Sequence, residues 1–318
     1  MDEILRAEGI SRIFEDGGLL GPKRIVRAVD DVSFSVYKGE VFVLAGESGS
    51  GKSTLANLIL NPAEADSGKV FFGGRAVDGA SDLKKVRMSC QMVHQDPYDS
   101  VNPGMKVADI VAEPLEIHGE GDKSYRKKRV LEALSEVRLE PPAEIAAKHP
   151  HMLSGGQRQR VALARALALK PGIIIADEPV SMLDVSIRAE MLELMSGLRK
   201  SHGITFLYIT HDLATARHFG DRIAVMYSGK IVEEGPVDTV LLRPAHPYTQ
   251  ALIDAISEPD PGNLHREKII RINDPPNDLR GGCSFRSRCP YAIDRCAEEP
   301  ELEDAGGGRR VACFARLE

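Results

Sequence analysis

The chain has 318 residues, of which 42% are hydrophobic and 28% charged, an ordinary composition for a folded protein. The binding of a nucleic acid usually needs a basic surface or aromatic stacking platforms. The chain has a formal net charge of −6, no Trp and only 5% aromatic residues, so we expect no nucleic-acid partner. No apolar run approaches the roughly 18–20 residues of a membrane-spanning helix, and residues 1–6 lack a secretory signal's apolar core, so we expect a cytosolic chain.

Residues 1–45 predict β-structure. Gly-rich Asp16–Lys23 predicts a long hairpin loop. The run Val41–Ala45 is continuously apolar, which is typical of a strand buried on both faces. Three apolar segments alternate with two turn-forming pairs: Val26–Val29, Asp30-Asp31, Val32–Val36, Lys38-Gly39 and Glu40–Ala45.

A glycine-rich loop follows, with the pattern G-x-x-x-x-G-K-S of a phosphate-binding loop. Its glycines let backbone N–H groups point at one anion, and a helix predicted over about Lys52–Leu60 adds its positive dipole end. The pattern also occurs by chance in turns without function, but the buried strand before it and the apolar helix after it favour nucleotide binding. The candidate nucleotide-binding residues here are Gly46, Ser48, Gly49, Gly51, Lys52, Ser53 and Thr54.

Three of these residues have distinct expected contacts. Lys52 would reach the β- and γ-phosphates of ATP. The Ser53 hydroxyl would bind Mg²⁺, and Thr54 would contact the region of the α-phosphate.

Helices and strands follow in an order that indicates an α/β core with an insert. Val107–His118 and Ser124–Arg138 have helical periodicity and predict a helical insert. The later alternation predicts a mostly parallel sheet with helices on its faces. Its elements are a helix at Gln157–Leu169, a strand at Gly172–Ala176, a helix at Ile187–His202, a strand at Ile204–Thr210, a helix at Leu213–Phe219 and a strand at Arg222–Tyr227.

Two carboxylates end the strand that contains Ile173–Ala176. Asp177 could hold Mg²⁺ beside Ser53, and Glu178 could orient the attacking water or accept its proton. The alternative is a strand that simply ends in a solvated acidic turn. The phosphate loop makes that alternative weaker, because ligands of open α/β sheets bind at the carboxyl ends of strands.

A second anion-binding helix start is predicted at Ser154-Gly155-Gly156. One chain has no obvious use for two phosphate cradles, whereas two chains arranged head to tail would cover each nucleotide with one cradle from each chain. Leu153 to Arg160 resembles the signature motif of ABC transporter ATPases, in which Ser154, Gly155, Gly156 and Gln157 would face the partner's nucleotide.

The resemblance to ABC transporter ATPases covers about residues 1–240 and implies further roles. Gln95 matches the glutamine that senses Mg²⁺ and the membrane subunit, and it is both a catalytic and a metal candidate. Asp184 ends the segment Ser181–Asp184, which matches the D-loop, and His211 matches the switch histidine on the γ-phosphate. Phe14 is the candidate for stacking on adenine.

The same resemblance implies the fold and the domain organisation. The expected fold is a P-loop NTPase (RecA-like) α/β core with an antiparallel β subdomain and a helical subdomain at about 98–150. Residues 1–240 would form the ATPase domain, and residues 241–318 a small Cys-rich extension joined through the linker-like stretch 257–282, which is rich in Pro, Asp, Asn and Gly.

Three segments are similar to the oligopeptide/dipeptide branch of this family: Gln91–Pro103, Asp177–Ser186 and His246–Leu252, with His94 and Met182 as departures. The branch implies an ATP-hydrolysing motor of a peptide importer at the cytoplasmic face of the cell membrane. Its expected partners are a second, different ATPase subunit, two transmembrane permease subunits and an extracytoplasmic substrate-binding protein.

Two alternative functions stay open. The same motor could serve oligosaccharide or nickel uptake, because the cargo is chosen by other subunits. A soluble ABC ATPase of DNA repair or translation is the other, although it would be expected to carry coiled-coil insertions or two cassettes on one chain.

Four of the five cysteines, Cys283, Cys289, Cys296 and Cys313, gather near the end of the sequence. In a cytosolic chain such a cluster favours a metal over disulfides. Four thiolates can bind Zn²⁺ or an iron–sulfur cluster, and the absence of C-x₂-C pairs favours [4Fe–4S], as does the branch resemblance. Free or disulfide-linked thiols are the alternative. The sequence gives no role to Cys90.

Overall fold

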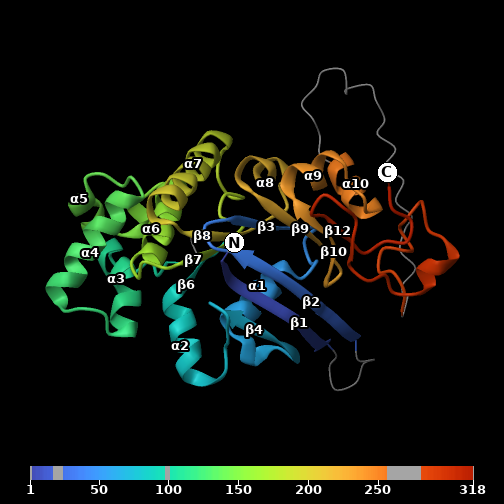
Figure 1. Ribbon diagram of the computed structural model, residues 1–318. Coiled ribbons are helices and arrows are strands. Elements are labelled where there is room, and N and C mark those ends of the chain that lie inside the picture. The colour runs from blue at the N-terminus through green and yellow to red at the C-terminus, as the bar shows by residue number, and fades with distance from the viewer. Residues whose placement is uncertain (1, 17–23, 97–100, 256–280, 318) are drawn as a thin grey trace.

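The computed structural model describes residues 2–16, 24–96, 101–255 and 281–317. An eight-stranded sheet and a four-stranded sheet form its centre, with helices packed around them (Figure 1). The predicted α/β class is confirmed. The linker-like stretch 257–282, apart from its last two residues, and the hairpin loop at 17–23 lie outside the described residues.

Five neighbouring strands of the large sheet run parallel, as the alternation of helices and strands predicts. Their order is β9-β3-β8-β7-β6. The strands are β3 (Val41–Ala45), β6 (Cys90–Val93), β7 (Ile173–Asp177), β8 (Thr205–Thr210) and β9 (Arg222–Tyr227). Every residue of β3, β7 and β8 is buried, which explains why their sequences are mostly apolar.

The antiparallel edge of this sheet joins the cysteine-rich segment to the core. β10 (Lys230–Pro236) pairs with β9, and β12 (Arg310–Val311) adds outside β10. β11 (Glu303–Asp304) completes the edge. The red segment in Figure 1 therefore lies directly against the large sheet.

The four-stranded sheet is antiparallel, in the order β2-β1-β4-β5. β1 (Glu3–Asp16) and β2 (Arg24–Tyr37) form a long hairpin, and β4 (Ser67–Phe72) and β5 (Arg75–Ala76) extend it.

The turn predicted at Asp30-Asp31 is wrong, because β2 continues through both residues. Asp31 takes a positive φ of 53°, and the pairing register with β1 shifts nearby. A β-bulge of this kind uses turn-forming residues without ending the strand.

Two hydrophobic cores cover the two faces of the large sheet. Alternate residues of each strand supply them, so Val43 belongs to one core and Leu44 to the other. α1 and the four-stranded sheet cover one face, and α6 to α9 cover the other. The helical subdomain, α3 to α5, packs beside α6 at the left of Figure 1.

The predicted helices are confirmed, with boundaries shifted by up to two residues. The predicted set is α1 (Lys52–Leu60), α3 (Val107–His118), α4 (Lys123–Glu136), α6 (Gly155–Leu167), α7 (Val185–His202) and α8 (Leu213–Phe219). Among the described residues, the helices without a sequence prediction are α2 (Gly79–Ser89), α5 (Pro142–Ala147), α9 (Val237–Leu242), α10 (Pro247–Asp254) and the 3₁₀ turns η1 (Pro62–Glu64), η2 (Pro150–Met152) and η4 (Asp294–Ala297).

Candidate active site

The carboxyl ends of four parallel strands meet at one edge of the large sheet. The last residue of β3, Ala45, is in register with Thr210, the last residue of β8. Asp177, the last residue of β7, is in register with Ile209, and β6 ends beside β7. The segments that follow these strands are therefore neighbours, and they carry the phosphate loop from Gly46, His211, Glu178 and Gln95.

Two glycines allow the phosphate loop to pass close to neighbouring backbone. A Cβ at Gly46 would lie 2.2 Å from the carbonyl oxygen of Met226, and one at Gly51 would lie 2.0 Å from that of Ala28. Both residues also have positive φ, of 151° and 104°. No residue with a side chain fits either position, so the loop depends on glycine for both space and conformation.

Lys52 lies inside the loop and is only 5% exposed. Its ammonium donates hydrogen bonds to the carbonyl oxygens of Gly46 and Glu47, both at 2.8 Å. Burial lowers the pKa of Lys52, and the carboxylates of Glu178 and Asp177 oppose that shift. These carboxylates favour a charged ammonium, the form that would attract phosphate.

Asp177 is arranged as a metal ligand would be. The residue is 8% exposed, and its carboxylate accepts a hydrogen bond from the Ser53 hydroxyl, while its Oδ1 atom is buried without a hydrogen-bond partner. Burial is the main cause of a raised pKa. A buried carboxylate oxygen without a partner is costly, and a cation beside Ser53 would satisfy it, so these residues fit Mg²⁺.

Glu178 and His211 form a direct contact. His211 Nδ1 lies 2.9 Å from Glu178 Oε1. Glu178 also has a positive φ of 46°, an uncommon backbone conformation for this residue type that is often found at functional sites. Its N–H donates to the carbonyl oxygen of Ile209 at 2.9 Å, which fixes the turn. The pair borders a cavity of about 240 Å³ whose lining also includes Ser181, Arg188 and Asp212.

The residues of the second predicted cradle lie at the start of α6. Ser154 caps α6, since its hydroxyl accepts from the N–H of Gln157 and the Gln157 side chain accepts from the N–H of Ser154. Ser154 is exposed, and no hydrogen bond within the described part of the chain joins residues 154–157 to the phosphate loop. Asp184 is also exposed, directly before α7.

Phe14 and Gln95 are both accessible. Phe14 lies on β1 with 45% of its surface exposed, and the guanidinium carbon of Arg12 lies 5.0 Å from its ring centroid. Gln95 is exposed just after β6. Both assigned roles stay predictions.

The four cysteines of the C-terminal segment come together. Cys289, Cys296 and Cys313 are buried, Cys283 is partly buried, and all are free thiols. The N–H of Cys283 donates to the carbonyl oxygen of Cys296 at 3.0 Å. Burial raises the pKa of Cys313 to about 11, and the other three thiols are close enough to contribute.

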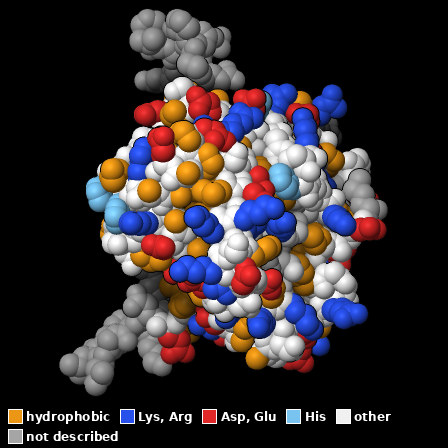
Figure 2. All heavy atoms as spheres, turned by 90° about the vertical axis from the view of Figure 1, so that its left-hand side faces the viewer, with side chains coloured by type: hydrophobic (Ala, Val, Ile, Leu, Met, Phe, Trp, Pro, Cys, Tyr) orange, Lys and Arg blue, Asp and Glu red, His pale blue; other side chains and the backbone are white. Residues whose placement is uncertain are grey.

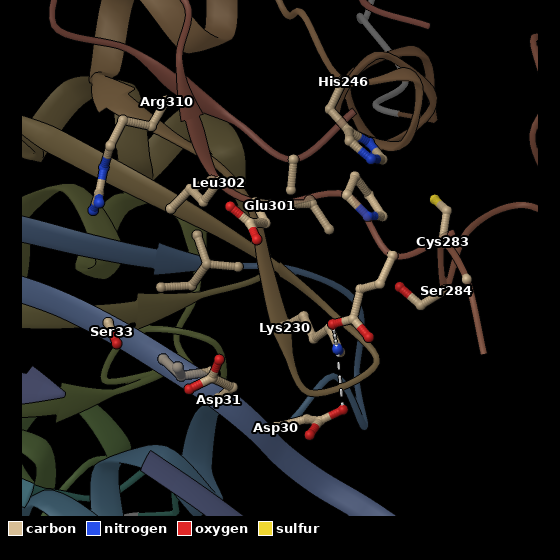
Figure 3. Close-up of a pocket in the computed structure, with 17 residues that line it drawn as sticks. Asp30, Asp31, Ser33, Lys230, His246, Cys283, Ser284, Glu301, Leu302 and Arg310 are labelled. Atoms are coloured by element: carbon tan, nitrogen blue, oxygen red, sulfur yellow. Dashed lines mark hydrogen bonds and ion pairs between the residues drawn. The ribbon is translucent and has the colours of Figure 1, made fainter. Parts of the chain in front are cut away.

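In the structure these thiols are not arranged as a metal-binding site. Within the described ranges, no group of three or more His, Cys, Asp or Glu side chains has the arrangement to hold a metal ion. Cys283 borders a cavity of about 430 Å³, shown in Figure 3 with His246 on the same side as Cys283. Lys230 and Asp30 form an ion pair of 3.2 Å on its lower side. The metal assignment stays a prediction.

One set of residues at this site has no local signal in the sequence. Tyr248 and Arg288 both contact Glu47 of the phosphate loop. Tyr248 lies in the segment His246–Leu252, whose sequence indicates the family branch but no contact, and Arg288 lies between two of the cysteines. No local pattern indicates either contact, because about 200 residues or more separate the partners.

Comparison with known proteins shows the family. The ABC transporter profile matches residues 29–181, and the profile of the oligopeptide/dipeptide transporter C-terminal region matches residues 232–296. A probable peptide ABC transporter ATP-binding protein of Sinorhizobium fredii is 44% identical over 99% of this chain and 90% of that protein. This chain belongs to the oligopeptide/dipeptide branch of the ABC transporter ATP-binding proteins. An oligopeptide transport ATP-binding protein of Bacillus subtilis is 47% identical over 87% of this chain and 92% of that protein.

Solved structures of ABC ATP-binding cassettes share the fold. One, a dimeric post-hydrolysis state bound to ADP and phosphate, has a TM-score of 0.64 at 31% identity and covers 74% of this chain and 99% of its own. Another, from a Clostridium perfringens ABC transporter complex, has a TM-score of 0.66 at 28% identity and covers 76% and 92%. The P-loop NTPase fold and the ATPase activity follow for this ABC protein. Among the helices of the described residues, none has the length and apolarity needed to span a bilayer.

Proposed function

We propose that this ABC protein is the ATP-hydrolysing motor of an importer for oligopeptides or dipeptides. The observation that carries the proposal is that one chain combines two features: a sheet edge at which the phosphate loop, Glu178 and His211 are neighbours, and the C-terminal region of the peptide branch. Relatives that are 42–47% identical carry peptide or oligopeptide transport in their names. The motor role explains why the chain has catalytic residues and yet needs no cargo site of its own.

The geometry supports the proposed hydrolytic roles. Lys52 would release its loop carbonyls to contact the β- and γ-phosphates of ATP. Glu178 would orient water for attack on the γ-phosphate, and His211 would hold both Glu178 and the transferred group. Ser53, Asp177 and Gln95 would hold Mg²⁺, which supplies charge neutralisation on the phosphates when bound.

The remaining site residues fit a nucleotide shared between two subunits. We assign Phe14 to adenine stacking and the glycine-rich loop to the phosphates of the same subunit. Residues Ser154 to Gln157 and Asp184 would act on the nucleotide of the opposite subunit, and their exposure supports this assignment. A dimeric cassette among the similar structures is consistent with such a pair. The branch favours a different chain as the partner ATPase.

A surface beside Gln95 suits a permease. β6, α3 and α6 border a cavity of about 270 Å³ that includes Met92, His94 and Pro114. Ile117 at its rim is 72% exposed. Figure 2 shows this side of the molecule, where hydrophobic side chains lie exposed among Lys and Arg side chains. We assign the permease contact to this surface, the chain to the cytoplasmic face of the cell membrane, and cargo delivery to an extracytoplasmic substrate-binding protein.

The domain organisation is proposed as an ATPase domain over residues 1–240, with its helical subdomain at about 98–150, and a C-terminal extension over residues 241–318. We assign a [4Fe–4S] cluster to Cys283, Cys289, Cys296 and Cys313, with Zn²⁺ as the alternative. The thiol donor set and its proximity support the assignment. Iron and sulfide analysis of anaerobically purified protein tests it. Colourless, iron-free protein with one Zn²⁺ per chain would overturn the cluster.

Uptake in the native cell tests the proposed function. Deletion of the gene should abolish uptake of a labelled tripeptide, and the wild-type gene, but not one encoding Lys52→Ala, should restore it. Unchanged peptide uptake with loss of nickel or oligosaccharide uptake would support the alternative cargo. Unchanged uptake of all three would favour a role outside transport.

A further inference from the structure

Glu47, the second residue of the phosphate loop, is bonded through three separate groups. Its N–H donates to the Tyr248 hydroxyl at 2.9 Å. Its carboxylate faces the Arg288 guanidinium in a two-pronged contact, at 3.2 and 3.4 Å. Its carbonyl oxygen accepts from Lys52 Nζ at 2.8 Å. Glu47 therefore connects the phosphate-binding lysine to two residues from distant parts of the sequence.

Those two residues belong to the C-terminal part of the chain. Tyr248 lies in α10, and Arg288 directly precedes Cys289. An aromatic cluster holds them together: the ring of Tyr248 lies 4.5 Å from that of Tyr227 and 5.5 Å from that of Phe285. Tyr248 and Phe285 are each 1% exposed, so the cluster is a packed core and not a surface contact.

A tight turn between two cysteines places Arg288. The N–H of Arg286 donates to the carbonyl oxygen of Cys283, and the N–H of Arg288 donates to that of Phe285, both at 3.0 Å. The N–H of Cys289 then donates to the carbonyl oxygen of Arg286 at 3.3 Å. Because the turn is short, a shift of Cys283 or Cys289 would move the guanidinium away from Glu47.

We infer that Tyr248 and Arg288 are positioning residues that hold Glu47, and that through them the cysteine-containing segment sets the affinity of the phosphate loop for ATP. The inference rests on ATP binding at the phosphate loop and is independent of the cargo. Coupling of this kind is reciprocal, so ATP binding should also stabilise the turn between Cys283 and Cys289.

The energies suggest a measurable effect. An exposed ion pair contributes little to stability, and Glu47 is 43% exposed in its side chain. The Arg288 contact is two-pronged and reinforced by a hydrogen bond to Tyr227 at 3.3 Å. We therefore expect Arg288→Ala to raise the Kd for ATP by roughly 5-fold or more, within the usual range of coupling between sites.

The first experiment separates positioning from folding. Purified full-length variants are titrated with a fluorescent ATP analogue, and KM and kcat are measured for the same preparations. Arg288→Ala and Tyr248→Phe should raise Kd and KM with little change in kcat, and Arg288→Lys should restore part of the affinity. Arg295→Ala is the matched control, since Arg295 lies in the same segment but packs over Phe314 at 4.2 Å.

A double-mutant cycle tests the link to the cysteines. Cys289→Ser should weaken ATP binding in the wild-type background and have little further effect in Arg288→Ala. Equal Kd values for wild type, Arg288→Ala and Tyr248→Phe, with unchanged thermal midpoints, would overturn the inference. Additive effects of Cys289→Ser and Arg288→Ala would overturn its link to the cysteines. Failure of the wild type itself to bind the analogue would instead contradict the ATPase function.

Discussion

Glu178 combines an uncommon backbone conformation with a direct contact to His211, and both features aim its carboxylate at the end of β8. Glu178→Gln keeps the shape of the side chain but removes its basicity. We expect kcat to fall by about 100-fold or more, because a positioned general base typically contributes that much. ATP should still bind, and phosphate release by the purified protein measures the loss.

The matched control for this change is Glu193→Gln, an isosteric substitution at an exposed position of α7. It should leave kcat within about two-fold of the wild type, since surface changes remote from a site have small effects. Hydrolysis by Glu178→Gln at the wild-type rate would show that another residue activates the water.

His246 is predicted to make folding sensitive to acid. Its Nδ1 accepts from the N–H of Tyr248 at 3.0 Å, and burial lowers the pKa of His246 to about 4, from 6.5 for an exposed imidazole. The unfolded chain thus binds a proton at pH values where the folded chain does not. Stability from this residue is complete above pH 6.5 and is lost as the pH falls toward 4, by about 2 kcal/mol between pH 7 and 5.

Urea unfolding at pH 7 and pH 5 checks this prediction. His246→Asn keeps an N-cap acceptor for α10 but cannot titrate, so it should lose less stability than the wild type between the two pH values. His218→Asn, at an exposed site in α8, should behave as the wild type does. Equal pH dependence in all three proteins would show that His246 is not the acid-sensitive group.

At the scale of elements, Gly156 sets the distance between α6 and α7. A Cβ at Gly156 would lie 2.7 Å from Ile187 Cγ2, whereas one at Gly155 would meet open space. Gly156→Ala should therefore lower the thermal midpoint and cost about 1–3 kcal/mol of stability, as expected for overpacking. Gly155→Ala should be neutral or slightly stabilising, because Ala favours helix. The reverse order of midpoints would contradict this packing argument.

The elements that the sequence predicts are those with a local cause. Continuous apolar runs indicate β3 and β7, and helical periodicity indicates α3 and α4. The two-residue strands β11 and β12 carry no such pattern, since they exist only because β10 offers an edge. The bulge at Asp31 could not be predicted from the sequence for a similar reason: its turn-forming residues are held in a strand by pairing with β1.

The candidate site divides in the same way at the scale of the whole molecule. The strand ends that carry Glu178 and His211 are predictable, because parallel strands present their carboxyl ends at one edge. The contacts of Glu47 with Tyr248 and Arg288 are not, because they depend on how the C-terminal part packs against the phosphate loop. Long-range packing leaves no periodic signal in the sequence.

The exposure of Ser154 leads to a prediction about assembly. If the start of α6 completes the nucleotide site of an opposing subunit, ATP should join two chains only when Ser154 can contact the ATP bound by that subunit. Glu178→Gln, which should retain ATP, is expected to roughly double in mass when Mg·ATP is added together with the partner ATPase subunit, measured by light scattering. Adding Ser154→Arg should abolish this doubling, because the larger cationic side chain would fill the space at the start of α6.

Two measurements make the assembly prediction specific. Without a partner subunit, Glu178→Gln/Ser154→Arg should bind ATP with a Kd within about two-fold of that of Glu178→Gln. The reason is that, among the described residues, Ser154 makes no hydrogen bond to the phosphate loop of its own chain. Ser201→Arg, the same change in the last turn of α7, should leave the doubling intact. Doubling that survives Ser154→Arg would mean that two chains associate through a different face, and that the start of α6 does not close the opposite site.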